Sequence, residues 1–326
     1  MKNIITSLTL LVFTTFGISQ ESKIQDILTL DTLISFPQSN TFRDKISLTC
    51  FEDELWVYLP GRRTDTLDFL VMDLLTNEQR FTSCLFPSMY FKIKNPVASN
   101  ISVNKDYICL HLSAKDLLVI LNRKKDVLKF REIVPINDEA YFLKLKGDHL
   151  YFAKHYNYHP KSSNNKTLLG KYNLKTNALE DFIVPPFDNI EFSHFNPNKW
   201  VAFSDEFNFF SETTTYKIRI YDNQLECIDS LETIKEDWFT LPQDTLNKVY
   251  SLARSAKSLI GFMEPIDGEI TRVEAIYQMN NDILFVIWIP PYKRDNDLYR
   301  KIDVWKKNSN GKFELAKEDL LDAAFD

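Results

Sequence analysis

The feature that most constrains this chain is a strand–turn–strand unit that recurs at an almost fixed interval. In each copy an apolar run ends in Asp or Asn, a polar turn follows, and a second strand begins. The steps between these marker residues are 49, 51 and 49 residues, the markers being Asp73, Asn122, Asn173 and Asp222. Modules of about 40–50 residues with four strands each are typical of β-propeller blades. The repeat therefore predicts an all-β fold of the propeller type.

Each unit expands into four strands when it is read outward from its central turn. Alternation such as Tyr141, Leu143 and Leu145 is strand-like, and helical periodicity is absent from the modules. The fourth module predicts strands at 190–195, 200–204, 216–222 and 225–231, with a long connection over 205–215. A last module covers 272–316.

Residues 233–270 break this rhythm. Leu246, Val249, Tyr250 and Ala253 recur at helical spacing after a potential N-cap at Asp244, so one short helix is expected over 245–257. The segment is either a degraded blade or an insertion. Six blades of about 51 residues fit the period better than five of about 61. A strand within 24–36 could close the ring, since a closed ring leaves no exposed edge.

The repeated unit of apolar strand, Asp or Asn, turn and strand resembles the secreted six-bladed propellers of the TolB-like kind. The resemblance covers nearly all of the chain after its first residues. It implies the fold, and it implies no catalytic residue because the shared pattern is generic. Residues 233–270 depart from the pattern, which leaves the blade count open.

The first nineteen residues resemble a secretory signal peptide. Lys2 is followed by an apolar stretch from Ile4 to Phe16, and Gly17 and Ser19 are small residues suited to signal peptidase. The apolar stretch is shorter than the roughly 20 residues that span a bilayer, and no later segment reaches that length. We therefore expect a signal peptide at 1–19, one propeller domain at 20–326, no membrane span, and a periplasmic or secreted location.

The composition excludes several classes of function. The formal net charge is −6, whereas nucleic-acid binding requires a basic surface. Only seven glycines occur, without a GxGxxG or P-loop motif, so no nucleotide or other cofactor is expected. The four cysteines show no CxxC spacing, and their positions in predicted strands favour free thiols over disulfides.

A ligand site is predicted at one end of the blades. Connections between strands two and three, and between strand four and the next blade, emerge on the same face of a propeller, and here they are mostly long. They carry aromatic and basic residues, which suit recognition of a protein, a peptide or a glycan, although aromatic residues of long loops also pack on each other. The candidate ligand-binding residues are Arg62, Arg63, Tyr156, His159, Phe209, Tyr292 and Arg294.

No spacing in the sequence singles out a catalytic set. His155 and His159 lie in a loop with Asn and Pro, without the helix or third ligand that a metal site would need, so no metal is expected. Acidic pairs such as Asp205 and Glu206 are common in solvated loops. The sequence therefore favours a secreted propeller that binds an unknown partner. The alternative is a propeller hydrolase acting on glycans or lactones.

Overall fold

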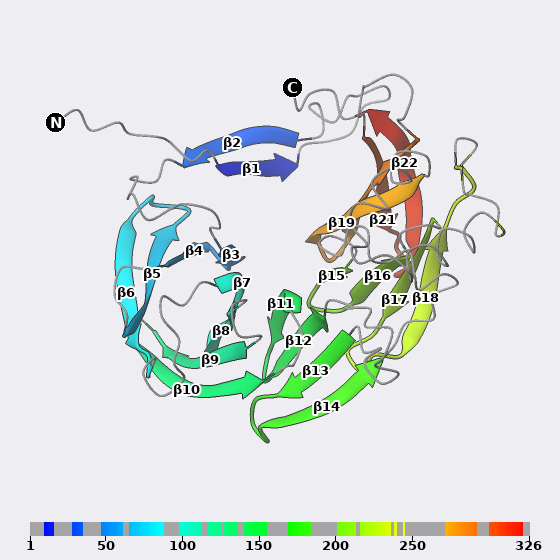
Figure 1. Ribbon diagram of the computed structural model, residues 1–326. Helices are drawn as coiled ribbons and strands as arrows, with labels where there is room; N and C mark the ends of the chain where they lie inside the picture. Colours follow the sequence, from blue (N-terminus) through cyan, green and yellow to red (C-terminus); the bar gives the residue numbers. More distant parts are fainter. Residues whose placement is uncertain are drawn as a thin grey trace. The chain divides into compact units, whose positions relative to one another are not determined.

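The structure is a computed structural model of the 326-residue chain. It describes residues 10–15, 28–34, 47–60, 65–87, 98–112, 117–125, 127–135, 140–154, 169–183, 201–212, 216–235, 238–239, 244, 271–291 and 300–321. The regular elements among these residues are all β-strands (Figure 1).

Residues 38–157 and 166–184 form one compact unit, which we call the three-blade unit. It contains three four-stranded antiparallel sheets, and the strands of each sheet neighbour each other in chain order. The strands are β3 (Leu48–Phe51), β4 (Glu54–Leu59), β5 (Thr66–Asp73), β6 (Gln79–Leu85); β7 (Ala98–Val103), β8 (Tyr107–Leu112), β9 (Leu117–Lys124), β10 (Val127–Pro135); β11 (Ala140–Lys146), β12 (His149–Lys154), β13 (Leu169–Asn173) and β14 (Ala178–Ile183).

Residues 1–37, 158–165 and 185–326 form the second unit, which we call the two-blade unit. Two sheets of the same topology lie in it, together with an antiparallel pair of strands near the N-terminus. The strands are β1 (Leu10–Thr15), β2 (Leu28–Ile34); β15 (Val201–Phe203), β16 (Asn208–Glu212), β17 (Lys217–Tyr221), β18 (Cys227–Glu232); β19 (Arg272–Asn280), β20 (Ile283–Ile289), β21 (Lys301–Lys307) and β22 (Phe313–Leu321).

The predicted fold class is confirmed: the chain is all-β and is built of propeller blades, each a four-stranded antiparallel meander. Five such blades lie among the described residues, and the predicted count of six is not confirmed. The strand expected within 24–36 is present as β2, and it pairs with β1. The helix expected over 245–257 lies outside the described residues.

The predicted strands of the fourth module are wrong in one respect. The stretch 205–215, expected to be a long loop, contains β16, and Val201–Phe203 is the first strand of the blade instead of the second. The expected strand over 190–195 lies outside the described residues. The aromatic residues of this stretch therefore belong to a strand that pairs on both sides, with β15 and with β17.

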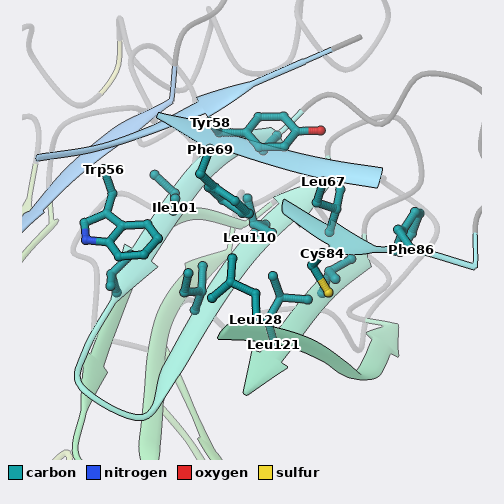
Figure 2. Packing of buried hydrophobic residues seen from close by; sticks show 14 of the residues in the cluster. Trp56, Tyr58, Leu67, Phe69, Cys84, Phe86, Ile101, Leu110, Leu121 and Leu128 are labelled. Atoms are coloured by element: carbon teal, nitrogen blue, oxygen red, sulfur yellow. The ribbon is translucent and has the colours of Figure 1, made fainter. Parts of the chain in front are cut away.

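Blades of the three-blade unit pack face to face through large apolar side chains. Figure 2 shows Trp56, Tyr58 and Phe69 of the first blade beside Ile101 and Leu110 of the second. All five are buried, and Trp56 and Phe69 meet edge to face with ring centroids 6.1 Å apart. Burial of this kind contributes about 25 cal/mol for each Å² of apolar surface, so the blades are held mainly by their flat faces.

At one end of each blade, short turns join the first strand to the second and the third to the fourth. We call this the short-turn end. One backbone hydrogen bond links the two turns: Leu74 N donates to Asp53 O at 2.7 Å, and Arg123 N donates to Asp106 O at 2.7 Å. The same bond recurs in two further blades, from Leu174 N to Asp148 O and from Lys307 N to Asp282 O, both at 2.8 Å.

Three of the four marker residues of the sequence repeat shape the second of these turns. Asp73 Oδ1 accepts hydrogen bonds from the backbone N–H groups of Leu75 and Thr76, which lowers the pKa of Asp73. Asn173 and Asp222 accept in the same way from residues two to four positions ahead, and so does Asn308 in the last blade, although it lies two positions further along than a marker would. Asp and Asn suit this task because their short side chains reach the backbone of their own turn.

Two of the residues that donate this turn-linking hydrogen bond are cations that also join neighbouring blades. Arg123 pairs with Glu54 at 2.7 Å, and its guanidinium lies 4.6 Å from the ring centroid of Trp56. At the equivalent position of the last blade, Lys307 pairs with Glu206 at 2.6 Å and lies 4.8 Å from the ring of Phe207. Each cation thus meets a carboxylate and an aromatic ring of the preceding blade, which combines ion pairing with a cation–π contact.

Replacing Arg123 with Ala tests this link. The Arg123 side chain is only 9% exposed, so its loss removes a nearly buried cation from the Trp56 ring and leaves Glu54 with Arg80 as its only guanidinium partner among the described residues. We expect the free energy of unfolding to fall by roughly 1–3 kcal/mol, as measured by denaturant titration. The matched control is Lys105→Ala, because Lys105 is 78% exposed and lies 4.0 Å from Asp106. Equal effects of the two changes would contradict a stabilising role for Arg123.

Candidate functional site

Most of the sequence-predicted site lies outside the described residues. This holds for Arg62, Arg63, Tyr156, His159, Tyr292 and Arg294. Phe209 is described, and the prediction that it lies in a ligand-binding loop is wrong. Its side chain in β16 is fully buried, with ring centroids 5.4 Å from Phe313 and 6.1 Å from Phe207. Phe209 is a core residue because the strand turns it toward the neighbouring blade of its unit.

The structure reveals another cluster in the two-blade unit, centred on Lys235, which the sequence did not predict. We call it the Lys235 cluster, and Figure 1 shows the strands that contribute to it. Its members lie at the end of the sheets opposite the short turns, where β17 and β21 begin and where β18, β20 and β22 end. They are Tyr216, Lys235, Trp238, Trp288, Lys301, Asp303, Trp305, Glu318 and Asp319.

Carboxylates from two adjacent strands surround the Lys235 ammonium. Its Nζ lies 2.9 Å from Asp303 Oδ1, 2.8 Å from Asp319 Oδ1 and 3.3 Å from Glu318 Oε2. The Lys235 side chain is 2% exposed and that of Asp303 is fully buried, whereas Asp319 and Glu318 are 41% and 59% exposed. The ion pairs therefore run from the interior of the unit to its surface.

Aromatic rings form the remaining wall around the ammonium. Lys235 Nζ lies 5.4 Å from the ring centroid of Trp288 and 5.6 Å from that of Tyr216. Trp238 packs between these two rings, at 5.8 Å from Trp288 and 5.7 Å from Tyr216. Trp305 Nε1 donates a hydrogen bond of 3.1 Å to the Tyr216 hydroxyl. A cation held between ring faces and carboxylates gains both cation–π and Coulomb attraction in a poorly hydrated place.

An irregularity in the last sheet brings two of these carboxylates together. The β21–β22 register shifts on both sides of Val304, and Asp319 adopts a left-handed backbone conformation with φ of 54°. Its backbone N–H donates to Asp303 Oδ1 at 2.9 Å. The bulge thus turns Asp319 toward the ammonium, in keeping with the common use of bulges to re-aim a side chain.

The segment 233–239, of which 233–235 and 238–239 are described, is fixed at both ends. Trp238 N donates to Lys235 O at 3.1 Å, which closes a turn. Phe239 and Thr271 exchange two hydrogen bonds, one from Phe239 N to Thr271 Oγ1 and one from Thr271 N to Phe239 O, both 2.9 Å. This frame turns Lys235 inward and leaves Ile234 95% and Phe239 48% exposed.

The surroundings of Lys235 and Tyr216 favour the protonated form of both side chains. Burial alone would lower the pKa of Lys235, but hydrogen bonds to Asp319 and Asp303 outweigh this and raise the pKa above its ordinary value. Burial and the nearby Asp303 carboxylate raise the pKa of Tyr216. At neutral pH the lysine is therefore an ammonium and the tyrosine a neutral phenol.

Other reactive side chains among the described residues are likewise held in their protonated forms. All four cysteines are free. Burial raises the pKa of Cys84 to about 11 and also raises the pKa of Cys50 and Cys109. No group of three or more His, Cys, Asp or Glu within the described ranges is placed to hold a metal ion. No helix among these ranges is long and apolar enough to cross a bilayer.

A Lys235→Met variant tests the cluster. Loss of the ammonium leaves the buried Asp303 carboxylate uncompensated, so we expect a fall of about 3–5 kcal/mol in the free energy of unfolding near neutral pH. Lys217→Met is the control, since Lys217 forms a more exposed pair with Glu232 at the start of β17. A loss no larger than that of the control would contradict the structural role of Lys235.

The same variant should change the pH dependence of stability. The folded-state pKa of Lys235 is raised, so its contribution is fully present below the unfolded-state pKa of about 10.4 and disappears as the pH rises through the folded-state pKa. The difference in unfolding free energy between wild type and Lys235→Met should therefore narrow at strongly alkaline pH. Denaturant titrations at several pH values measure it, and a constant difference would argue against the raised pKa.

Comparisons with known proteins place the chain in no family. No family model and no curated protein matches it. Among solved structures it is similar to a DUF4221 family member from Bacteroides vulgatus, with 10% identity over 84% of this chain and 80% of the other and a TM-score of 0.47. It is also similar to the periplasmic gluconolactonase of Pseudomonas aeruginosa, with 8% identity over 87% of this chain and 73% of the other and a TM-score of 0.46. BamB of Moraxella catarrhalis has 8% identity over 82% of this chain and 66% of its own, with a TM-score of 0.41. Similarities at these TM-scores carry no argument about function.

Proposed function

We propose that this chain is an exported β-propeller protein that binds a partner and does not turn over a substrate. In this proposal residues 1–19 are a signal peptide, and residues 20–326 form one propeller of six blades of the TolB-like kind in the periplasm or outside the cell. The partner is a protein, a peptide or a glycan. The proposal requires neither a metal nor a cofactor.

The observation that carries the proposal is the ion-paired, protonated state of Lys235 in the Lys235 cluster. A catalytic lysine must lose its proton to act as a nucleophile or a base, which burial and like charges favour by lowering its pKa. Here the carboxylates of Asp303 and Asp319 raise the pKa of Lys235. The Tyr216 hydroxyl, whose pKa is also raised, is a poor acid–base group at neutral pH. The cluster is suited to hold a surface rigidly and not to transfer protons.

A protein surface whose side chains are already held in place binds a partner at a lower entropic cost. Binding costs conformational entropy for each side chain that becomes ordered, and a preorganised surface has already lost that entropy on folding. Residues 233–235 and 238–239 are held by the buried Lys235 ammonium and by the two hydrogen bonds between Phe239 and Thr271. The six predicted residues outside the described ranges are proposed as a further ligand-binding set: Arg62, Arg63, Tyr156, His159, Tyr292 and Arg294.

The rival function is hydrolysis of glycans or lactones. We expect the purified mature chain to give no product above the uncatalysed rate with a panel of aldonolactones, aryl glycosides and peptides, as followed by chromatography. An Asp303→Asn variant is assayed in parallel. Sustained turnover by the wild type would overturn the proposal, and its loss in Asp303→Asn would place the chemistry in the Lys235 cluster.

Export is tested by N-terminal sequencing of the chain expressed with its first residues in a Gram-negative host. We expect the purified protein to begin at Gln20 and to appear in the periplasmic fraction. Cleavage there would remove β1, which is the strand that pairs with β2. Retention of Met1 in a membrane fraction would contradict the proposed location.

A further inference from the structure

We propose that β6 (Gln79–Leu85) is a dimer interface, at which two copies of the chain pair their β6 strands antiparallel about a two-fold axis at Ser83. The pairing joins two four-stranded sheets into one sheet of eight strands. The inference concerns the three-blade unit and goes beyond the proposed function, because it holds whether the chain binds a partner or turns over a substrate.

The first argument is the direction of the backbone groups of β6, which is the last strand of its sheet among the described residues (Figure 1). Hydrogen bonds from Asp73 N to Glu78 O and from Phe86 N to Asp65 O close the two ends of the β5–β6 ladder. Residues that bond to the partner strand alternate along an antiparallel ladder with residues that do not, so the N–H and C=O groups of Ser83 point away from β5. Such an edge is a template for a further strand.

The second argument is that β6 lacks the features that protect the fourth strands of the other described blades. The ladders that end in β10, β14, β18 and β22 each contain a register shift, whereas β5 and β6 pair without one. Those four strands also carry carboxylates, whereas the one charged residue of β6 is Arg80, which pairs with Glu54 of its own blade. Bulges and charges prevent edge-to-edge association, so β6 is the least protected of the five edges.

The third argument is the set of side chains that β6 exposes. Phe81 is 59% and Leu85 75% exposed, whereas Cys84 between them is buried in the core shared with the second blade (Figure 2). One face of β6 therefore packs inside the unit, and the other presents apolar side chains to solvent. Both lie on the same face of the sheet because they are separated by an even number of residues.

The spacing of these side chains selects a second copy of the chain as the occupant. Phe81 lies two residues before Ser83 and Leu85 two residues after it. With the axis at Ser83, each Phe81 stands directly opposite the partner's Leu85, and cross-strand pairs of apolar side chains stabilise a sheet. No like charges meet, because the side chains at 79, 81, 83 and 85 are uncharged. The two-fold axis also closes the contact, so the pair does not extend into a fibre.

Sedimentation velocity of the purified protein over a range of concentrations tests the interface. We expect the wild type to be a dimer that dissociates on dilution. Ser83→Pro removes an N–H group that points away from β5, so the β5–β6 ladder is kept while a hydrogen bond between the copies is lost. The dissociation constant of the dimer should rise at least about ten-fold, and the circular dichroism spectrum should match that of the wild type.

A charge exchange tests the position of the axis. Ser83→Lys and Ser83→Glu each place like charges opposite each other across the axis, so each variant alone should be monomeric. An equimolar mixture of the two should form a dimer, because an ammonium then meets a carboxylate. The matched control is Ile228→Lys, which adds a charge at a 51% exposed position of β18 and should dimerise like the wild type.

The proposal is overturned if the wild type is monomeric at every concentration, if Ser83→Pro dimerises as strongly as the wild type, or if the mixture of charge variants stays monomeric. A monomeric wild type would leave the β6 edge to a different protein or to another segment of this chain. A dimer that survives both kinds of change at Ser83 would place the interface elsewhere. None of these outcomes depends on turnover or export, so they are separate from the tests of the proposed function.

Discussion

The described blades depend on how the backbone polar groups at their short-turn ends are satisfied. A buried N–H or C=O without a partner is costly, and a slip of one residue would turn every apolar side chain of a strand to the wrong face. The hydrogen bond from Leu74 to Asp53, and its equivalents in three other blades, ties one hairpin of a blade to the other. With the strands fixed in register, Trp56, Phe69 and Leu110 meet in the core between blades.

Cations in both units follow a single chemical arrangement. Arg123, Lys307 and Lys235 each lie between a carboxylate and an aromatic ring. The first two join neighbouring blades at the short-turn end, whereas Lys235 fixes a connection at the opposite end. Positive charge is thus used largely for internal contacts around these sites. The consequence at the Lys235 cluster is that the cation is buried while two of the carboxylates that pair with it, Glu318 and Asp319, stay partly exposed.

Much of the fold could be predicted from the sequence because its signals are local. Asp73 and Asn173 mark the turns since their side chains bind the backbone of those same turns. The fourth module differs from its predicted strands because β15 has only three residues, and the polar turn at Ser204 has the composition of a loop. The Lys235 cluster has no local sequence pattern, because Lys235 forms its hydrogen bonds with residues 68 and 84 positions away in the chain. One signal in the sequence is Asp303, a carboxylate between the apolar Ile302 and Val304 of β21.

The hydrogen bond that links the two turns of a blade has a consequence for how far such sequences can diverge. Its donor and acceptor are both backbone groups, and the donor position holds Leu, Arg or Lys, whereas the acceptor position holds Asp in all four blades. In the turns that contain Asp222 and Asn308, the short side chain of an Asp or an Asn accepts the same kind of backbone hydrogen bond. Natural selection can therefore replace most of a blade while its geometry is preserved. Proteins that descend from one such ancestor can share this architecture after their amino-acid sequences have lost every recognisable similarity.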